Sequence, residues 1–120
     1  FASDPIRSEE FVDVLGEKWN LPSGGSHKAT VFIFLGYDCP ISNGYAKEVT
    51  RICEDYDGKK ILFCMVYADG DLKLDDAKKH AKEYGYRSPA ILDPKMILAQ
   101  KTGATVKPEA VVLSPKGEVL

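Results

Sequence analysis

The chain has 120 residues and a mass of 13.2 kDa, which suits a single domain spanning residues 1–120. Hydrophobic residues make up 44% and charged residues 28%, a globular composition that excludes a disordered or collagen-like chain. The 16 basic and 18 acidic side chains give a net charge of −2, so no basic excess indicates a nucleic-acid partner.

A short hairpin and a buried strand are expected first along the chain. The apolar–polar stretches 11–14 and 18–21 predict a β-hairpin in which Trp19 faces inward. Residues 22–26 (PSGGS) predict a loop. Residues 30–35 (TVFIFL) are β-branched and aromatic on both faces, which is typical of a central strand.

One long helix and a second buried strand are expected next. Apolar residues at spacings of three and four predict an amphipathic helix that ends at Asp57–Gly58. Its apolar stripe consists of Ile41, Tyr45, Val49, Ile52 and Tyr56. Residues 61–68 (ILFCMVYA) form the longest apolar run, which is too short for the roughly 18 residues of a membrane span and predicts a strand.

A further helix and a short strand complete the alternation. The helix is expected over 74–84, ending at Gly85, and its inner face consists of Leu74, Ala77, Ala81 and Tyr84. His80 borders this face, which predicts a packed or surface histidine rather than a catalytic one. Residues 90–92 predict the short strand.

The last part of the chain predicts a short helix and a β-hairpin. Asp93–Pro94 supplies an N-cap and a proline at the first helical position, and Gly103 closes the helix. Residues 109–113 (EAVVL) predict a strand. A type I turn at 114–117 (SPKG) then leads into a returning strand that begins at 118–120.

Alternating strands and helices predict an α/β fold. Its central sheet is expected to be mixed but mostly parallel and flanked by helices, with the N-terminal β-hairpin before it. The final hairpin predicts an antiparallel edge. Because a strand has only begun at Leu120, we expect the natural chain to continue, which makes this single domain truncated at its C-terminus.

The cysteines do not indicate a disulfide framework or a metal site. Cys39, Cys53 and Cys64 are odd in number and show no Cys-x-x-Cys spacing, and no metal or other cofactor is expected. Along a continuous helix Cys53 would lie roughly 21 Å from Cys39, too far for a disulfide. Cys53 lies on the apolar stripe and Cys64 inside a strand, so both are expected to be inert core residues.

Cys39 is the candidate reactive residue. It follows the central strand, at the carboxyl edge where α/β sheets bind ligands. Pro40 suits a first helical turn, so Cys39 is the expected N-cap, where unpaired N–H groups and the helix dipole would stabilise a thiolate. The pattern therefore predicts a nucleophile; the alternative is a structural cysteine that only caps the helix.

The segment Cys39–Pro40–Ile41–Ser42–Asn43 resembles the redoxin branch of the thioredoxin superfamily. This branch contains alkyl-hydroperoxide-reductase/thiol-specific-antioxidant proteins and TlpA-like thiol-disulfide proteins, and the resemblance covers nearly the whole chain. It implies a thioredoxin-like fold and a single nucleophilic cysteine that performs thiol–disulfide exchange or peroxiredoxin-like peroxide reduction. The implied partners are a disulfide-containing protein or a small thiol or peroxide, with an external reductant. TlpA-like relatives imply a bacterial extracytoplasmic location, with the cytoplasm as the alternative.

The resemblance also implies roles for residues around Cys39. Pro108 matches the superfamily's cis-proline, which faces the nucleophile, while Ser42 and Lys107 would tune the thiolate. The candidate substrate-binding residues are Tyr37, Asp38, Pro40 and Asn43. Tyr45 also flanks the site but is expected in the core.

The sequence departs from each well-known active site of the superfamily. Ser42 stands where thioredoxins have a second cysteine, and Asp38 and Ile33 replace their tryptophan and buried acid. Gly36 replaces the threonine of peroxiredoxins, and Asn43 the second cysteine of copper-assembly relatives. These departures keep a second hypothesis open, a catalytically degenerate binding or redox-sensor module; a metal chaperone lacks its ligands and ranks last.

Overall fold

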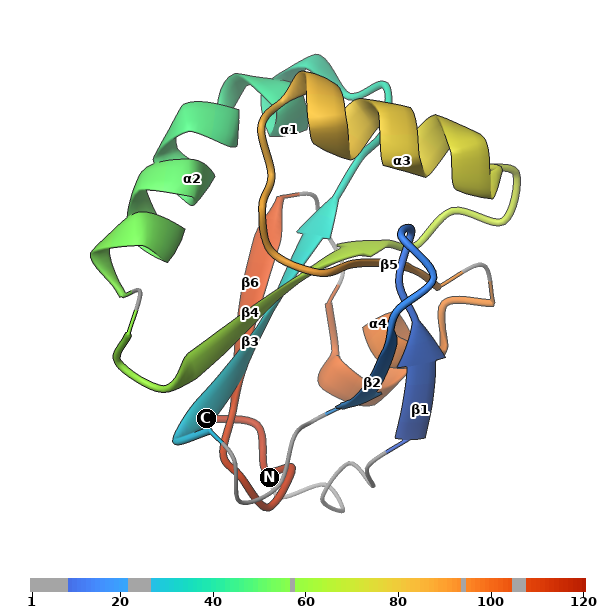
Figure 1. The fold of residues 1–120 in the computed structure, drawn as a ribbon. Helices are drawn as coiled ribbons and strands as arrows, with labels where there is room; N and C mark the ends of the chain where they lie inside the picture. Colours follow the sequence, from blue (N-terminus) through green and yellow to red (C-terminus); the bar gives the residue numbers. More distant parts are fainter. Residues whose placement is uncertain (1–8, 22–26, 57, 94, 105–107) are drawn as a thin grey trace.

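A four-stranded mixed sheet, with strands in the order β5-β4-β3-β6, forms the centre of the computed structural model (Figure 1). The structure describes residues 9–21, 27–56, 58–93, 95–104 and 108–120. The elements in chain order are β1 (Glu9–Val12), β2 (Lys18–Leu21), β3 (Ala29–Leu35), α1 (Pro40–Gly44), α2 (Ala46–Asp55), β4 (Ile61–Tyr67), α3 (Leu74–Glu83), β5 (Ala90–Leu92), α4 (Ile97–Thr102) and β6 (Glu109–Leu113). Strands β3, β4 and β5 are parallel, and β6 pairs antiparallel with β3, as the alternation and the final hairpin predict.

Side chains of β3 and β4 alternate between two hydrophobic cores, one on each face of the sheet. On one face Phe34 packs in a cluster with Leu21 of the hairpin and Leu98 of α4. On the other face Ile33 packs in a cluster with Val49 of α2 and with residues of α3. Figure 1 shows the same arrangement, with α1, α2 and α3 on one side of the sheet and the hairpin with α4 on the other.

The long helix expected from Ile41 to Tyr56 is two helices, α1 and α2, so this prediction was wrong. They meet at Tyr45, whose backbone (φ −91°, ψ 1°) lies between them. Of the members of the expected apolar stripe only Val49 is buried. Tyr45, expected in the core, is 52% exposed.

Asp13 organises the N-terminal hairpin; it follows β1 directly and forms an isolated bridge with Ile91, where the sequence predicted a continuing strand. Its buried carboxylate accepts hydrogen bonds from the backbone N–H groups of Leu15 (2.8 Å) and Glu17 (2.9 Å) and from the indole N–H of Trp19 (2.8 Å). The backbone N–H of Val14 donates to the carbonyl of Ala90 in β5 (2.9 Å), which attaches the hairpin to the sheet. Trp19 packs against the core cluster that contains Phe34 and Leu98, so it faces inward as predicted.

Helix α4 starts later than the sequence predicts, because Met96 in left-handed conformation precedes its first residue. Asp93 is not the N-cap by position, yet its carboxylate accepts the N–H groups of residues 97–99 at 2.9–3.2 Å and so performs the capping function. Gly103 ends the helix in left-handed conformation (φ 79°), which confirms its predicted role.

The returning strand predicted at the end of the chain is reduced to one isolated bridge between Leu113 and Val119. The turn before it forms as expected, with the N–H of Gly117 donating to the carbonyl of Ser114 (2.9 Å). The predicted loop at 22–26, Asp57, Pro94 and Lys107 lie outside the described residues.

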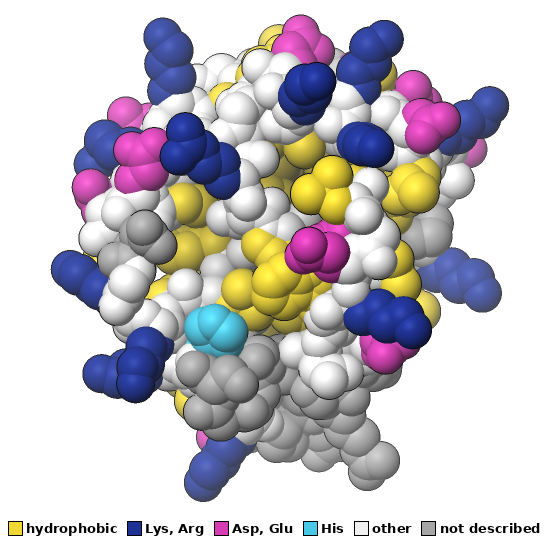
Figure 2. All heavy atoms as spheres, in the orientation of Figure 1, with side chains coloured by type: hydrophobic (Ala, Val, Ile, Leu, Met, Phe, Trp, Pro, Cys, Tyr) yellow, Lys and Arg dark blue, Asp and Glu magenta, His cyan; other side chains and the backbone are white. Residues whose placement is uncertain are grey.

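The surface seen from the side of Figure 1 is mixed. Lysine, arginine and acidic side chains ring its edge, and hydrophobic side chains are exposed toward its centre (Figure 2). Among the described residues, no helix has the length and apolar character that a membrane crossing requires.

Candidate functional site

The strand register brings the candidate residues to one edge of the sheet. The last residue of β3 pairs with Tyr67, the last residue of β4, so both strands end at the same level. Strand β6 runs the other way, and its first residue, Glu109, pairs with the next-to-last residue of β3. Pro108, which precedes β6, therefore lies at the edge from which the loop to Cys39 leaves β3.

Cys39 occupies the N-cap of α1 in extended conformation (φ −88°, ψ 114°), as predicted, and Pro40 follows in the first turn. Its backbone carbonyl accepts the N–H of Asn43 (2.9 Å), which closes the first helical turn. Its side chain makes no capping hydrogen bond and is partly exposed. The thiol is therefore not used to cap the start of the helix, and the residue that carries it is partly accessible to solvent.

Ser42 holds the loop that carries Cys39. It is 1% exposed, and its hydroxyl oxygen accepts the backbone N–H of Gly36 (3.0 Å) directly after β3. This satisfies a buried backbone donor and fixes the start of the loop against α1. A bond from the Ser42 hydroxyl to the Cys39 sulfur stays a prediction.

A chain of side-chain hydrogen bonds, which the sequence reasoning missed, lies behind the loop. The Asn43 amide donates to the carbonyl of Tyr37 (3.3 Å), and its oxygen lies 2.7 Å from Nε2 of His80. Nδ1 of His80 lies 2.7 Å from the hydroxyl of Tyr67. We call Tyr37, Asn43, His80 and Tyr67 the Asn43–His80–Tyr67 network.

His80 is 4% exposed, so of the two placements that the sequence left open, packed or at the surface, the packed one is observed. Its ring is surrounded by tyrosine rings, with centroid distances of 4.7 Å to Tyr84, 5.4 Å to Tyr37 and Tyr67, and 6.3 Å to Tyr86. Burial lowers the pKa of His80, and Glu83 opposes this to a smaller extent. The signal available in the sequence was the position of His80 between two small residues on the inner face of α3.

The remaining predicted site residues are distributed along the same loop and edge. Tyr37 is partly buried, while Asp38 and Pro40 are exposed beside Cys39. Pro108 is partly exposed, and the isomer of the peptide bond before it stays a prediction because that bond involves Lys107, outside the described residues. The part of the chain that the structure describes contains no group of three or more His, Cys, Asp or Glu residues arranged to hold a metal ion.

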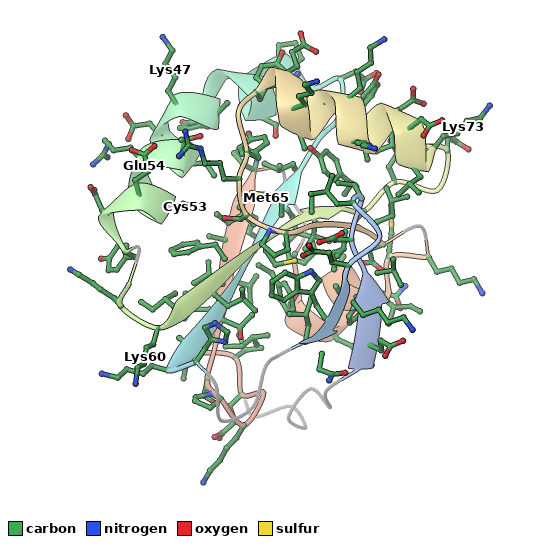
Figure 3. The ribbon with its side chains drawn as sticks, in the orientation of Figure 1. Lys47, Cys53, Glu54, Lys60, Met65 and Lys73 are labelled. Atoms are coloured by element: carbon green, nitrogen blue, oxygen red, sulfur yellow. The ribbon has the colours of Figure 1, made fainter. Side chains whose placement is uncertain are left out.

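The other two cysteines have different surroundings. Cys64 is fully buried in β4, which confirms the prediction of a core residue, and burial raises the pKa of its thiol. Cys53 is partly buried and packs against the core cluster that contains Val49 and Met65, so the prediction of a core residue is confirmed only in part for it. It faces a cavity of about 270 Å³ between α2 and the segment before β5, next to Met65 of β4 (Figure 3). Burial raises the pKa of Cys53 as well, although the Ser88 hydroxyl donates to its sulfur (3.8 Å).

An apolar groove of about 520 Å³ lies on the sheet face beside α2. The side chains that line it include Ile33, Ile52, Phe63 and Val112, and Tyr45 and Pro108 also contribute to its wall. The apolar residues of α2 that the sequence assigned to the core face this groove, which explains their exposure.

Comparison with known proteins identifies the fold. No family model matches the sequence, and a search of curated proteins gives no match. Among solved structures, a hypothetical protein from Sinorhizobium meliloti 1021 is similar with a TM-score of 0.80 and 17% identity, over 98% of this chain and 70% of that one. A putative thiol:disulfide interchange protein DsbE from Chlorobium tepidum has a TM-score of 0.80 and 18% identity, over 100% of this chain and 82% of that one.

A third similar structure is a secreted Mycobacterium tuberculosis disulfide oxidoreductase described as homologous to E. coli DsbE. Its TM-score is 0.76 at 13% identity, over 94% of this chain and 81% of that one. At these identities the similarity establishes the fold, which is thioredoxin-like, as the resemblance of the sequence implied.

Proposed function

We propose that this thioredoxin-like protein is a thiol–disulfide oxidoreductase that acts through a single nucleophilic cysteine, Cys39. The observation that supports the proposal most directly is the position of Cys39, a partly exposed residue after the carboxyl end of β3 whose side chain is not used by the helix cap. Several proteins of similar structure are described as thiol–disulfide oxidoreductases.

The proposed reaction is thiol–disulfide exchange in two steps. The Cys39 thiolate attacks one sulfur of a substrate disulfide, a new S–S bond forms, and the second substrate sulfur leaves as a thiolate that takes a proton from water. Ser42 stands at the position of a resolving cysteine and cannot attack the mixed disulfide. An external thiol must therefore attack it, forming a disulfide with the substrate and releasing Cys39 with its electrons restored.

The substrate class that fits this chemistry is a disulfide-containing protein or a small disulfide, with an external thiol as reductant. Reduction of a peroxide is the related alternative: the thiolate attacks a peroxide oxygen, an alcohol or water leaves, and two external thiols reduce the resulting sulfenic acid. An extracytoplasmic bacterial location is proposed, since one protein of similar structure is described as secreted.

The proposal predicts selective mixed-disulfide formation at Cys39. Mild treatment with a 2-pyridyl disulfide at pH 7 is expected to add one adduct at Cys39, because the raised pKa values of Cys53 and Cys64 leave those thiols protonated. Intact mass and peptide mapping measure the adduct. Cys39→Ser should abolish it, and Cys53→Ser, the matched control, should retain it.

The second candidate is a catalytically degenerate binding or sensor module. It is favoured by Ser42 in place of the second cysteine and by Gly36 in place of the peroxidase threonine. The same experiment, with mild peroxide as a second reagent, separates a reactive Cys39 from an unreactive binding scaffold. Selective addition at Cys39 would support the enzyme or a redox sensor. No adduct, or equal modification of all three thiols, would support the binding scaffold and contradict an activated Cys39; reaction with peroxide but with no disulfide would support the peroxidase alternative.

A further inference from the structure

The Asn43–His80–Tyr67 network links strand β4 and helices α1 and α3 to the loop that carries the thiol. His80 comes from α3, Tyr67 from the end of β4 and Asn43 from α1, and both nitrogens of the imidazole have a partner at 2.7 Å. A buried histidine with two short hydrogen bonds in opposite directions has a fixed ring orientation. The network therefore constrains all three elements at once.

The partners of His80 specify where its proton lies. The Asn43 amide nitrogen donates to the Tyr37 carbonyl, so the amide oxygen is the atom that faces His80, and this oxygen can only accept. Nε2 of His80 must therefore carry a hydrogen. In the neutral ring Nδ1 is then an acceptor, and the Tyr67 hydroxyl donates to it. The donors thus run in one direction, from the Tyr67 hydroxyl through His80 and Asn43 to the Tyr37 carbonyl.

This arrangement acts on the loop that holds Cys39. Asn43 binds the loop twice, through its amide to the Tyr37 carbonyl (3.3 Å) and through its backbone N–H to the Cys39 carbonyl (2.9 Å). Ser42 holds the start of the same loop at Gly36 (3.0 Å). The position of the sulfur relative to an incoming disulfide depends on these bonds, and His80 orients the residue that makes two of them.

The groups around His80 favour its neutral form. Tyr67 faces it from β4, Tyr37 from the loop after β3, and Tyr84 and Tyr86 from the segment after α3; Glu83 is the nearby carboxylate, on α3 itself. A second proton would sit on Nδ1 and point at the Tyr67 hydroxyl. That hydroxyl would then lose its acceptor in a buried place, which costs free energy.

We propose that His80, in its neutral form with the proton on Nε2, is a positioning residue that holds Asn43 and the Tyr37–Cys39 segment in the geometry needed for attack by the thiol. This inference rests on the proposed function, because it assigns a role in the exchange reaction of Cys39. It predicts that protonation of His80 slows the reaction by loosening the loop, without contact between His80 and the substrate.

The test measures the rate of adduct formation at Cys39 with 2,2′-dipyridyl disulfide between pH 4 and pH 8. His80→Leu is expected to lower the rate about tenfold, since small misplacements of a reacting group have effects of this order or larger. His80→Gln keeps an N–H toward Asn43 and should restore most of the rate. The acid inflection of the wild type, below the ordinary histidine pKa of about 6.5, should vanish in His80→Gln.

Two further variants control the assignment. His27→Gln removes the other histidine of the chain and should leave the inflection in place. Tyr67→Phe removes the hydroxyl that donates to Nδ1, so the pKa of His80 should rise and the inflection should move to higher pH. These two variants and His80→Gln decide the question even where His80→Leu does not fold.

The tautomer is measured separately by ¹⁵N NMR of the imidazole at pH 7, where we expect a protonated Nε2 and an unprotonated Nδ1. The opposite tautomer, a charged ring, or an acid inflection that is retained in His80→Gln and does not move in Tyr67→Phe would overturn the positioning role and leave the proposed function intact. A wild-type protein that gives no Cys39 adduct would overturn the proposed function, and the positioning role with it.

Discussion

At the scale of single residues, Ser42 shows how a departure from the thioredoxin motif is used by the fold. A cysteine at this position would supply a second thiol for exchange. The serine hydroxyl oxygen instead accepts a hydrogen bond from the buried backbone N–H of Gly36. Ser42 is the buried residue of α1, with 1% of its surface exposed. Ser42 therefore stabilises the loop between β3 and α1, independently of any effect on the Cys39 thiol.

Ser42→Ala is expected to destabilise the protein by about 1–3 kcal/mol, because it leaves a buried backbone donor without an acceptor. Urea unfolding followed by circular dichroism measures the free energy of unfolding. Ser114→Ala is the matched control, since the Ser114 hydroxyl also accepts backbone N–H groups but at an exposed turn. Equal effects of the two substitutions would show that burial of the Gly36 donor is unimportant.

His80 makes a second residue-scale prediction, about stability and pH. Its pKa is lowered in the folded protein, so at acid pH the unfolded chain binds more protons than the folded one. The contribution of neutral His80 to the free energy of unfolding is therefore complete above the pKa that His80 has in the unfolded chain. It is lost as the pH falls through the lower pKa of His80 in the folded protein. Denaturant unfolding at pH 7.5 and pH 5 should therefore show a smaller loss for His80→Gln than for the wild type, with His27→Gln behaving like the wild type.

Sequence reasoning predicted that Cys39 is the N-cap of a helix, which is confirmed, but it did not find the network behind the loop. Cys39–Pro40 after a buried strand is a local pattern, and local patterns are readable from the chain. The partners of His80 are 13 and 37 residues away, so only the pairing of strands and the packing of α3 bring them together. The burial of His80 was predictable from the small residues on either side of it along α3, and its hydrogen bonds were not.

At the scale of elements, the strands were predicted more accurately than the helices. The bounds of β5 and β6 match the expected 90–92 and 109–113, because both strands are short apolar runs between clear turn signals. The helix after Cys39 was predicted as one because its apolar spacing continues through Tyr45, where the backbone breaks. The spacing of apolar residues alone does not reveal a break between two helices when the apolar residues keep the same spacing across it.

Helix α4 supplies the prediction at this scale. Asp93→Ala removes the carboxylate that accepts the N–H groups of residues 97–99, and we expect a loss of about 2 kcal/mol in the free energy of unfolding. Asp69→Ala is the control, because Asp69 accepts a single exposed N–H from Asp71 outside any helix. A loss no larger than that of the control would contradict the capping role of Asp93.

At the scale of the whole molecule, the alternation of strands and helices was sufficient to predict the sheet, its mixed direction and its two covered faces. It was not sufficient to predict how completely each face is covered. The apolar groove beside α2 is lined by residues that the sequence assigned to the core, such as Ile52, which is 37% exposed. Periodicity reports that a side chain is apolar, whereas its burial depends on what packs against it.

The groove makes a prediction about the surface of this chain. An apolar fluorescent dye such as anilinonaphthalene sulfonate should bind there, and Val112→Asp should reduce its fluorescence because it places a charge in the apolar lining. Val119→Asp is the matched control, since Val119 is similarly exposed but does not line the groove. Equal loss of fluorescence in both variants would place the dye elsewhere.

The serine one turn after Cys39 has a practical consequence if the thiol exchanges as proposed. In a motif with two cysteines the second thiol can attack the mixed disulfide from within the same molecule and release the substrate. With Ser42 in that place, a mixed disulfide between Cys39 and a substrate protein would persist until an external thiol attacks it. Acid quenching of living cells followed by non-reducing electrophoresis would display its clients as ladders of slower bands that collapse on addition of dithiothreitol.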